Sequence, residues 1–208
     1  MMRTMVVLVT VLGFFGSVAL AKDEPLKRTG GLIDAFKSVK SAPEGKELTP
    51  ADKKANAKAY RRLDGFFDWE RLLGKPLEPH REKFSTEQLE RCKAVFKQLI
   101  RIIAYPNSGD FFREAKYSIK QPVIKGELAD VEMDGELVKE DFEIAVTFHW
   151  MDSESHWRIV DVSFDGASLV KDYQNQFGRI IDKEGAQGLL KRMEDRLQEE
   201  EEKRGKLP

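Results

Sequence analysis

Apolar residues recur every three or four positions in several stretches of the chain, a spacing that is typical of amphipathic helices. One such stretch covers residues 32–39, and a second helix is expected to begin at Thr49-Pro50, where a capping threonine precedes a proline. The polar segment 41–50 predicts a linker between them. The clearest helix opens with the capping box Ser85 to Gln88 and is expected to end near Tyr105-Pro106, because proline disfavours a helical residue before it.

Beyond residue 112 the apolar period shortens to two, which predicts β-strands. Residues 114–125 indicate an edge strand, because Pro122 cannot donate a hydrogen bond to a central ladder. A weaker strand over residues 127–133 is expected to end in a hairpin turn at Asp134-Gly135.

Residues 142–150 alternate most regularly, with large apolar side chains on one face and polar ones on the other. The next strand covers residues 157–164. Ser168 is the expected N-cap of a final helix, whose apolar stripe is interrupted by Gly185 and Gly188. Helices thus precede and follow an antiparallel meander. This order predicts an α+β fold, with a twisted antiparallel sheet of about four strands covered by N- and C-terminal helices.

The first 21 residues are typical of a secretory signal peptide. Arg3 is followed by an apolar run from Met5 to Phe15, and Ala19-Leu20-Ala21 is a small-x-small cleavage site. The run is shorter than the ~20 residues that a membrane span needs. We therefore expect cleavage after Ala21, a folded domain over residues 22–193, and a charged, solvated tail over residues 194–208.

The charge balance excludes a nucleic-acid binder that relies on bulk positive charge, since 35 Lys and Arg face 36 Asp and Glu, giving a net charge of −1. Hydrophobic residues make up 41% of the chain, which excludes a disordered tail. The single cysteine excludes a disulfide scaffold and a CxxC metal site.

Catalytic and metal-binding motifs are missing from the sequence. His80, His149 and His156 do not pair at helical metal-ligand spacing, and surface or turn positions are favoured for them. No GxSxG, GxGxxG or P-loop motif occurs. Cys92 falls within an apolar helix stripe, which favours a buried, inert thiol. We therefore expect no metal site and no cofactor.

The last third of the chain resembles the MlaC family. The matching blocks are WRIVDV from Trp157 to Val162, GASLV from Gly166 to Val170, and YQNQF from Tyr173 to Phe177. The family pattern is approximately W-x-V-x-D-V, then E-G-V-S-L-V-x-N-Y-R-x-Q-F. A looser block agrees near Phe67-Asp68 and Leu72-Leu73-Gly74.

This resemblance implies a periplasmic phospholipid carrier, an auxiliary component of an ABC transporter that serves outer-membrane lipid asymmetry. It implies an NTF2-like fold whose sheet and helices enclose the acyl chains in a cavity. The implied partners are an inner-membrane ABC transporter complex and an outer-membrane lipoprotein complex, with only transient membrane contact. Each exposed methylene costs ~0.8 kcal/mol, so two acyl chains with about thirty methylenes would cost on the order of 20 kcal/mol in water. A carrier must therefore hide the chains.

The apolar periodicity of the matching blocks supplies the candidate lining of that cavity. These lipid-binding candidates are Leu72, Leu73, Phe96, Leu99, Ile100, Ile103, Phe142, Ile144, Val146, Phe148, Phe164, Leu169, Tyr173 and Phe177.

Three other interpretations stay open on the sequence. The same stripes would form an ordinary packed core if no cavity exists, because periodicity does not separate a filled core from a hollow one. An enzyme on an NTF2-like fold would use Asp161 or Tyr173 as acid or base in an apolar pocket. A secreted interaction module would bind another protein through the sheet edge or the charged tail.

Overall fold

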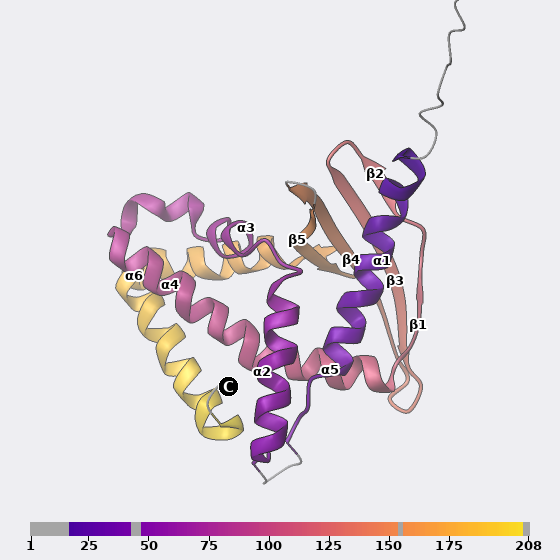
Figure 1. The fold of residues 1–208 in the computed structure, drawn as a ribbon. Helices are drawn as coiled ribbons and strands as arrows, with labels where there is room; N and C mark the ends of the chain where they lie inside the picture. The colour runs from indigo at the N-terminus through magenta and orange to yellow at the C-terminus, as the bar shows by residue number, and fades with distance from the viewer. Residues whose placement is uncertain (1–16, 43–46, 154–155, 206–208) are drawn as a thin grey trace, which may run out of the picture.

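The computed structural model describes residues 17–42, 47–153 and 156–205, and for residues 17–23 only the backbone (Figure 1). The expected signal peptide therefore lies mostly outside the described residues, and residues 17–21 form the first part of a helix. Within the part of the chain that the structure describes, no helix combines the length and apolar character needed to cross a bilayer.

Of the helical segments before the sheet, the two with predicted caps begin where expected, whereas the first helix begins well before the predicted stretch 32–39. These segments are α1 (Ser17–Lys37), α2 (Pro50–Asp64), α3 (Trp69–Gly74), the 3₁₀ segment η1 (Glu78–Lys83), α4 (Thr86–Leu99), the π-helical turn η2 (Ile100–Ala104) and α5 (Tyr105–Glu114). Thr49 caps α2 by accepting a hydrogen bond from the Asp52 amide at 3.1 Å. Ser85 and Gln88 form the predicted capping box of α4, with bonds of 3.1 and 3.0 Å.

The expected end of the long helix near Pro106 is wrong. The π-helical turn η2 continues α4, and α5 follows without a loop, with Pro106 in its first turn. Proline lacks the amide that would bond one turn back, and a first helical turn tolerates this loss. A π turn is wider than an α-helical turn. Ile100 and Ala104 of this turn line the same cavity as side chains of α5.

The sheet is antiparallel and is flanked by helices, as predicted, but it has six strands instead of about four. Its strands are β1 (Lys116–Ile119), β2 (Val123–Lys125), β3 (Leu128–Leu137), β4 (Phe142–Ser153), β5 (His156–Phe164) and β6 (Ala167–Ser168). The order is β1-β3-β4-β5-β6, and β2 also pairs with β3. Pro122 divides the predicted edge strand into β1 and β2, both of which pair with β3.

The predicted turn at Asp134-Gly135 is also wrong, because β3 runs through both residues to Leu137. Gly135 pairs with Ile144, and a Cβ atom at Gly135 would lie 2.9 Å from the Phe111 ring. The glycine thus gives room to an aromatic ring instead of forming a turn. The chain reverses over residues 138–141, where Asp141 has a positive φ of 51°.

The last helix, α6 (Leu169–Arg204), begins at the predicted cap, where Ser168 accepts a bond from the Lys171 amide. Gly185 interrupts it with a φ of 74°, as expected, whereas Gly188 stays helical. The helix continues through most of the segment expected as a solvated tail. Leu197 and Glu200 are buried there.

The apolar core is divided into two clusters that correspond to two sides of the molecule. One lies between the sheet and helices α1, α2 and α5, and the other lies where α4 packs against α6 (Figure 1). The α4–α6 cluster contains the buried Cys92 thiol, as the sequence predicts. This division decides which predicted lining residues surround open space.

Candidate functional site

An apolar cavity of about 300 Å³ separates the inner face of the sheet from α1, η2 and α5. Strands β4 and β5 form one wall, and the helices form the other. Its lining comprises Leu32, Phe36, Phe67, Ile100, Ala104, Tyr105, Asn107, Ser108, Phe111, Phe112, Phe142, Ile144, Val146, Phe148, Val162, Phe164 and Leu169. Folded interiors are close-packed, so an apolar space of this size points to an occupant.

The cavity opens at the end of the sheet where β4 begins and β5 ends. Phe142 is 44% exposed and Phe164 is 41% exposed, although both line the cavity. On the opposite lip, Ala104 and Asn107 are also exposed. Deeper in, Leu32 and Phe36 of α1 are buried. The cavity therefore has a closed apolar bottom and a mouth rimmed by two aromatic rings and a polar helix turn.

The cavity volume limits what it holds in this conformation. A methylene group occupies about as much space as a water molecule, roughly 30 Å³. A space of about 300 Å³ therefore has room for about ten methylenes, or part of one acyl chain.

The structure brings only half of the predicted lining residues to the cavity. These are Ile100, Phe142, Ile144, Val146, Phe148, Phe164 and Leu169. Lipid contact by any of them stays a prediction.

The other half lies elsewhere, mostly in the packed cluster between α4 and α6. Phe96 contacts Tyr173 and Phe177 there, with ring centroids 4.7 and 5.1 Å apart. Leu73, Leu99 and Ile103 belong to or pack against the same cluster, and Leu72 lies in the other cluster. The described side chains pack against one another here and do not line the apolar cavity, so lipid contact by these residues also stays a prediction.

Sequence reasoning missed the helical wall of the cavity. Leu32 and Phe36 were assigned to an amphipathic helix but not to the lining, and Phe112 was placed where the strand pattern begins. Phe111 received no assignment. Phe36 stacks on Phe112 at 5.8 Å, and Phe112 contacts Phe111 at 5.2 Å. The apolar stripe over residues 32–39 was the available signal.

Tyr105 links the cavity wall to a charged cluster on α2, α4 and η2. Its hydroxyl donates to Asp64 at 2.8 Å, and Asp64 also lies 3.7 Å from Lys97 and 3.8 Å from Arg101. Burial, reinforced by the Asp64 charge, raises the pKa of Tyr105. Burial likewise raises the pKa of the neighbouring Tyr60 to about 12.

These tyrosines predict a loss of stability at alkaline pH. The unfolded Tyr60 ionises near pH 10, whereas the folded residue stays neutral up to about pH 12, so each added pH unit between these values favours unfolding. The contribution of Tyr60 that is present below pH 10 and lost by pH 12 is about 2–3 kcal/mol. Urea unfolding between pH 8 and 11.5 should show a shallower decline for Tyr60→Phe than for the wild type. Parallel declines would contradict this assignment.

The two residues suspected in the enzyme interpretation do not share a pocket. The Asp161 carboxylate accepts hydrogen bonds from the Val162 and Val170 amides and the Ser168 hydroxyl, so it fastens β5 to the start of α6. Tyr173 packs against Phe96 and Phe177. This geometry gives Asp161 a structural role.

A hydrogen-bonded row that the sequence did not predict crosses the outer face of the sheet. His149 on β4 bonds Asp130 on β3 through Nδ1 and Ser163 on β5 through Nε2, both at 2.7 Å. The connectivity matches a Ser-His-Asp triad. However, Ser163 is only 6% exposed, and the row lies on the face opposite the apolar cavity. We interpret the row as a polar connection between three strands.

Replacing His149 by alanine should therefore destabilise the fold by about 1–2 kcal/mol, because the buried Ser163 hydroxyl loses its partner. The loss of stability is measured by thermal unfolding of the wild type, the two single variants and the double variant. The double variant His149→Ala/Ser163→Ala should recover part of the loss, since no buried hydroxyl is then left unpaired. Additive effects of the two substitutions would contradict the interpretation.

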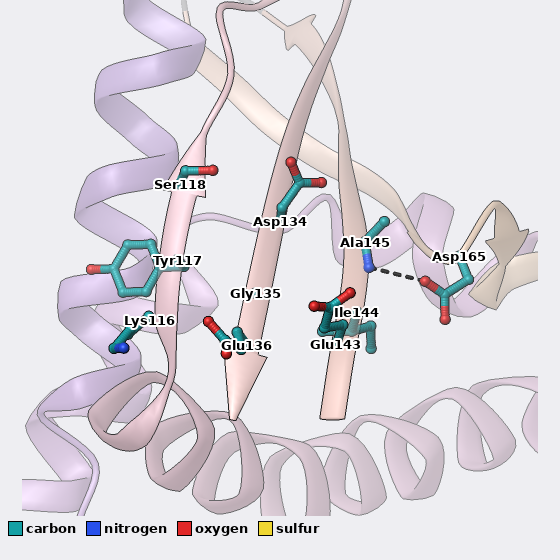
Figure 2. A pocket seen from close by; sticks show the side chains of 10 residues that line it. All are labelled: Lys116, Tyr117, Ser118, Asp134, Gly135, Glu136, Glu143, Ile144, Ala145 and Asp165. Atoms are coloured by element: carbon teal, nitrogen blue, oxygen red, sulfur yellow. Dashed lines mark hydrogen bonds between the residues drawn. The ribbon is translucent and has the colours of Figure 1, made fainter. Parts of the chain in front are cut away.

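A polar groove of about 810 Å³ lies on the outer side of β1, β3 and β4 (Figure 2). Asp134, Glu136, Glu143 and Asp165 line it together with Lys116. Asp165 accepts a bond from the Ala145 amide at 2.9 Å, drawn as a dashed line in Figure 2. Charged walls of this kind disfavour an acyl chain. Among the described residues, no group of three or more His, Cys, Asp or Glu is arranged to hold a metal ion.

Known proteins resemble this chain at the level of family and fold. No curated protein sequence matches it. A solved structure of a phospholipid-binding protein from Ralstonia solanacearum, in complex with a phospholipid, superposes with a TM-score of 0.65 at 16% identity. The match covers 86% of this chain and 98% of that one. At this identity it shows a shared fold. The model of the MlaC protein family matches residues 34–195, most of the described sequence, and the chain therefore belongs to the MlaC family.

Proposed function

We propose that this chain is a periplasmic phospholipid carrier that holds acyl chains in the cavity between the sheet and α1, η2 and α5. The single observation that carries the proposal is this apolar cavity with its exposed aromatic rim. Membership of the MlaC family and a shared fold with a phospholipid-bound protein support it. The geometry favours binding over catalysis, because the described residues that line the apolar cavity include no convergent acid–base pair.

The energetics of lipid transfer explain why such a cavity is useful. Each methylene moved from water into the cavity contributes ~0.8 kcal/mol, so about ten methylenes contribute roughly 8 kcal/mol. A phospholipid with two chains needs more room than the present volume offers. We propose that the helical wall moves away from the sheet when a lipid enters, which lets the cavity match its occupant.

The family also suggests where the lipid comes from and goes. We propose that the carrier exchanges lipid with an inner-membrane ABC transporter complex and an outer-membrane lipoprotein complex. The signal peptide, with cleavage after Ala21, and the lipid-binding domain over residues 22–193 belong to the same proposal. The exposed Phe142 and Phe164 place apolar surface at the mouth, where the lipid must pass.

A transfer assay tests the carrier function directly. Donor vesicles with a self-quenched fluorescent phospholipid are mixed with unlabelled acceptor vesicles and the chain lacking residues 1–21. We expect dequenching at a rate proportional to protein concentration, and fluorescent lipid in the protein fraction after the vesicles are removed. Transfer no faster than in buffer, with no lipid in the protein fraction, would overturn the proposal.

A further inference from the structure

We propose that Arg204, together with Asn107 and Ser108, forms a binding site for the phosphodiester of the lipid head group at the mouth of the cavity. This inference rests on the proposed carrier function and adds the class of head group that the cavity selects. It concerns a segment that the sequence analysis assigned to a solvated tail.

The end of α6 returns to the lip of the cavity. After the break at Gly185, the yellow half of the helix runs back toward α2 and the start of α5 (Figure 1). Arg204 Nη1 then donates to Asn107 Oδ1 at 3.3 Å. Asn107 and its neighbour Ser108 both line the cavity, and Asn107 is exposed at its mouth. Arg204 is therefore joined by a direct bond to the polar lip.

The groups on this lip are mainly hydrogen-bond donors. Because Asn107 Oδ1 accepts from Arg204, the amide offers its two Nδ2 hydrogens. Arg204 has five N–H groups, of which Nε is used on Glu200 and one Nη1 hydrogen on Asn107. The remaining hydrogens, and the Ser108 hydroxyl, have no partner among the described residues. A phosphodiester offers the matching acceptors, and arginine binds phosphate with two parallel bonds.

A buried carboxylate holds the Arg204 side chain in place. Glu200, only 3% exposed, lies between Arg196 and Arg204, with nitrogen–oxygen distances of 2.7 Å to both. Arg196 also pairs with Glu199 at 3.2 Å, so the two arginines face two carboxylates. Glu200 fixes the Arg204 guanidinium, whose side chain is 38% exposed and whose remaining Nη hydrogens can bind an anion. A fixed, partly exposed guanidinium loses little conformational freedom when it binds an anion.

The position of the lip agrees with where a head group must lie. Acyl chains in the cavity have their free ends near the buried Leu32 and Phe36, so the glycerol and phosphate emerge at the mouth beside Asn107. Phe142 and Phe164, which form the opposite lip among the described lining residues, are apolar and carry no hydrogen-bond donor in their side chains. The α5 side is therefore the part of the described mouth that can distinguish a charged head group from an uncharged one.

Arg204 lies beyond the part of the chain that the MlaC family model matches, residues 34–195. The Arg204 contact proposed here is therefore not taken from the family match.

The test compares two lipids with the same acyl chains, dipalmitoyl phosphatidylglycerol and dipalmitoylglycerol, bound to the otherwise intact chain. We expect the wild type to prefer the phospholipid by about tenfold, as one charge-assisted contact at a partly exposed site would give. Arg204→Gln should abolish this preference while leaving dipalmitoylglycerol binding unchanged. Arg196→Gln is the matched control, because Arg196 pairs with the same Glu200 but lies away from Asn107, and it should keep the preference.

The possible outcomes separate the two proposals. If the wild type binds neither lipid, the carrier function fails. If it binds both equally, or if Arg196→Gln loses the preference as completely as Arg204→Gln, the phosphate site is wrong while the carrier function stands. Inorganic phosphate is added as a competitor. If it weakens phospholipid binding only at concentrations far above the lipid concentration, the site is a head-group site. Tight phosphate binding without lipid would instead identify a free-phosphate site and overturn the inference.

Discussion

Replacing Val162 by tryptophan should reduce phospholipid binding at least tenfold while the protein stays folded. Val162 lines the cavity from β5 and pairs in register with Phe148 of β4. An indole at this position projects into space that the acyl chain would occupy. Tryptophan is well tolerated in strands, and the cavity offers the volume for the ring, so little strain is expected. Binding is measured with a fluorescent phospholipid, and folding is measured by thermal unfolding.

Thr147→Trp is the matched control for this substitution. Thr147 lies on β4 and points to the outer face of the sheet, where its partner in register is Ser163. The same indole is therefore added to the same sheet on the side away from the cavity. This variant should bind lipid as the wild type does. Equal binding by all three proteins would mean that the acyl chains do not occupy the space beside Val162.

Replacing Gly109 by alanine should destabilise the fold by about 3 kcal/mol, a large fraction of the 5–15 kcal/mol of a typical domain. A Cβ atom there would lie 2.8 Å from the Phe36 carbonyl oxygen and 3.3 Å from Val39 Cβ. The first neighbour is backbone, so it moves only if α1 and α5 separate. The measurement is the free energy of unfolding in urea.

Gly30→Ala controls for the intrinsic effect of alanine in a helix. Nothing lies within 4 Å of a Cβ atom at Gly30 in α1, and alanine has the higher helix propensity, so this variant should be as stable as the wild type or slightly more stable. A destabilisation of Gly109→Ala no larger than that of Gly30→Ala would show that the close approach of α1 and α5 does not hold the cavity wall in place.

Local features of the fold were predictable because short-range chemistry determines them. The caps at Thr49, Ser85 and Ser168 follow from side chains that bond an amide within three residues. The alternation over residues 142–150 likewise defines the inner face of β4. Gly135 shows where this reasoning ends: an Asp-Gly pair ordinarily favours a turn, but a ring from Phe111 requires the glycine within a strand.

The strand side of the cavity lining could be predicted from the sequence, whereas the helix side could not. The strand residues were assigned from their period, which fixes the face on which they lie. The period did not separate lining residues from core residues on the helices. Phe96 and Ile100 belong to one predicted stripe, yet Phe96 packs against α6 and Ile100 lines the cavity. The π turn and the packing of α1 on α5 decide this division. Both depend on contacts between distant segments, which periodicity along the chain does not contain.

Native mass spectrometry of the chain purified from bacterial cells without detergent shows whether the protein carries a lipid. We expect a population heavier than the protein by the mass of one phospholipid. Collisional activation should release the intact lipid, and the heavier population should be depleted in Val162→Trp but not in Thr147→Trp. A spectrum that contains only the mass of the bare polypeptide, even after incubation with phospholipid vesicles, would contradict the proposed lipid binding.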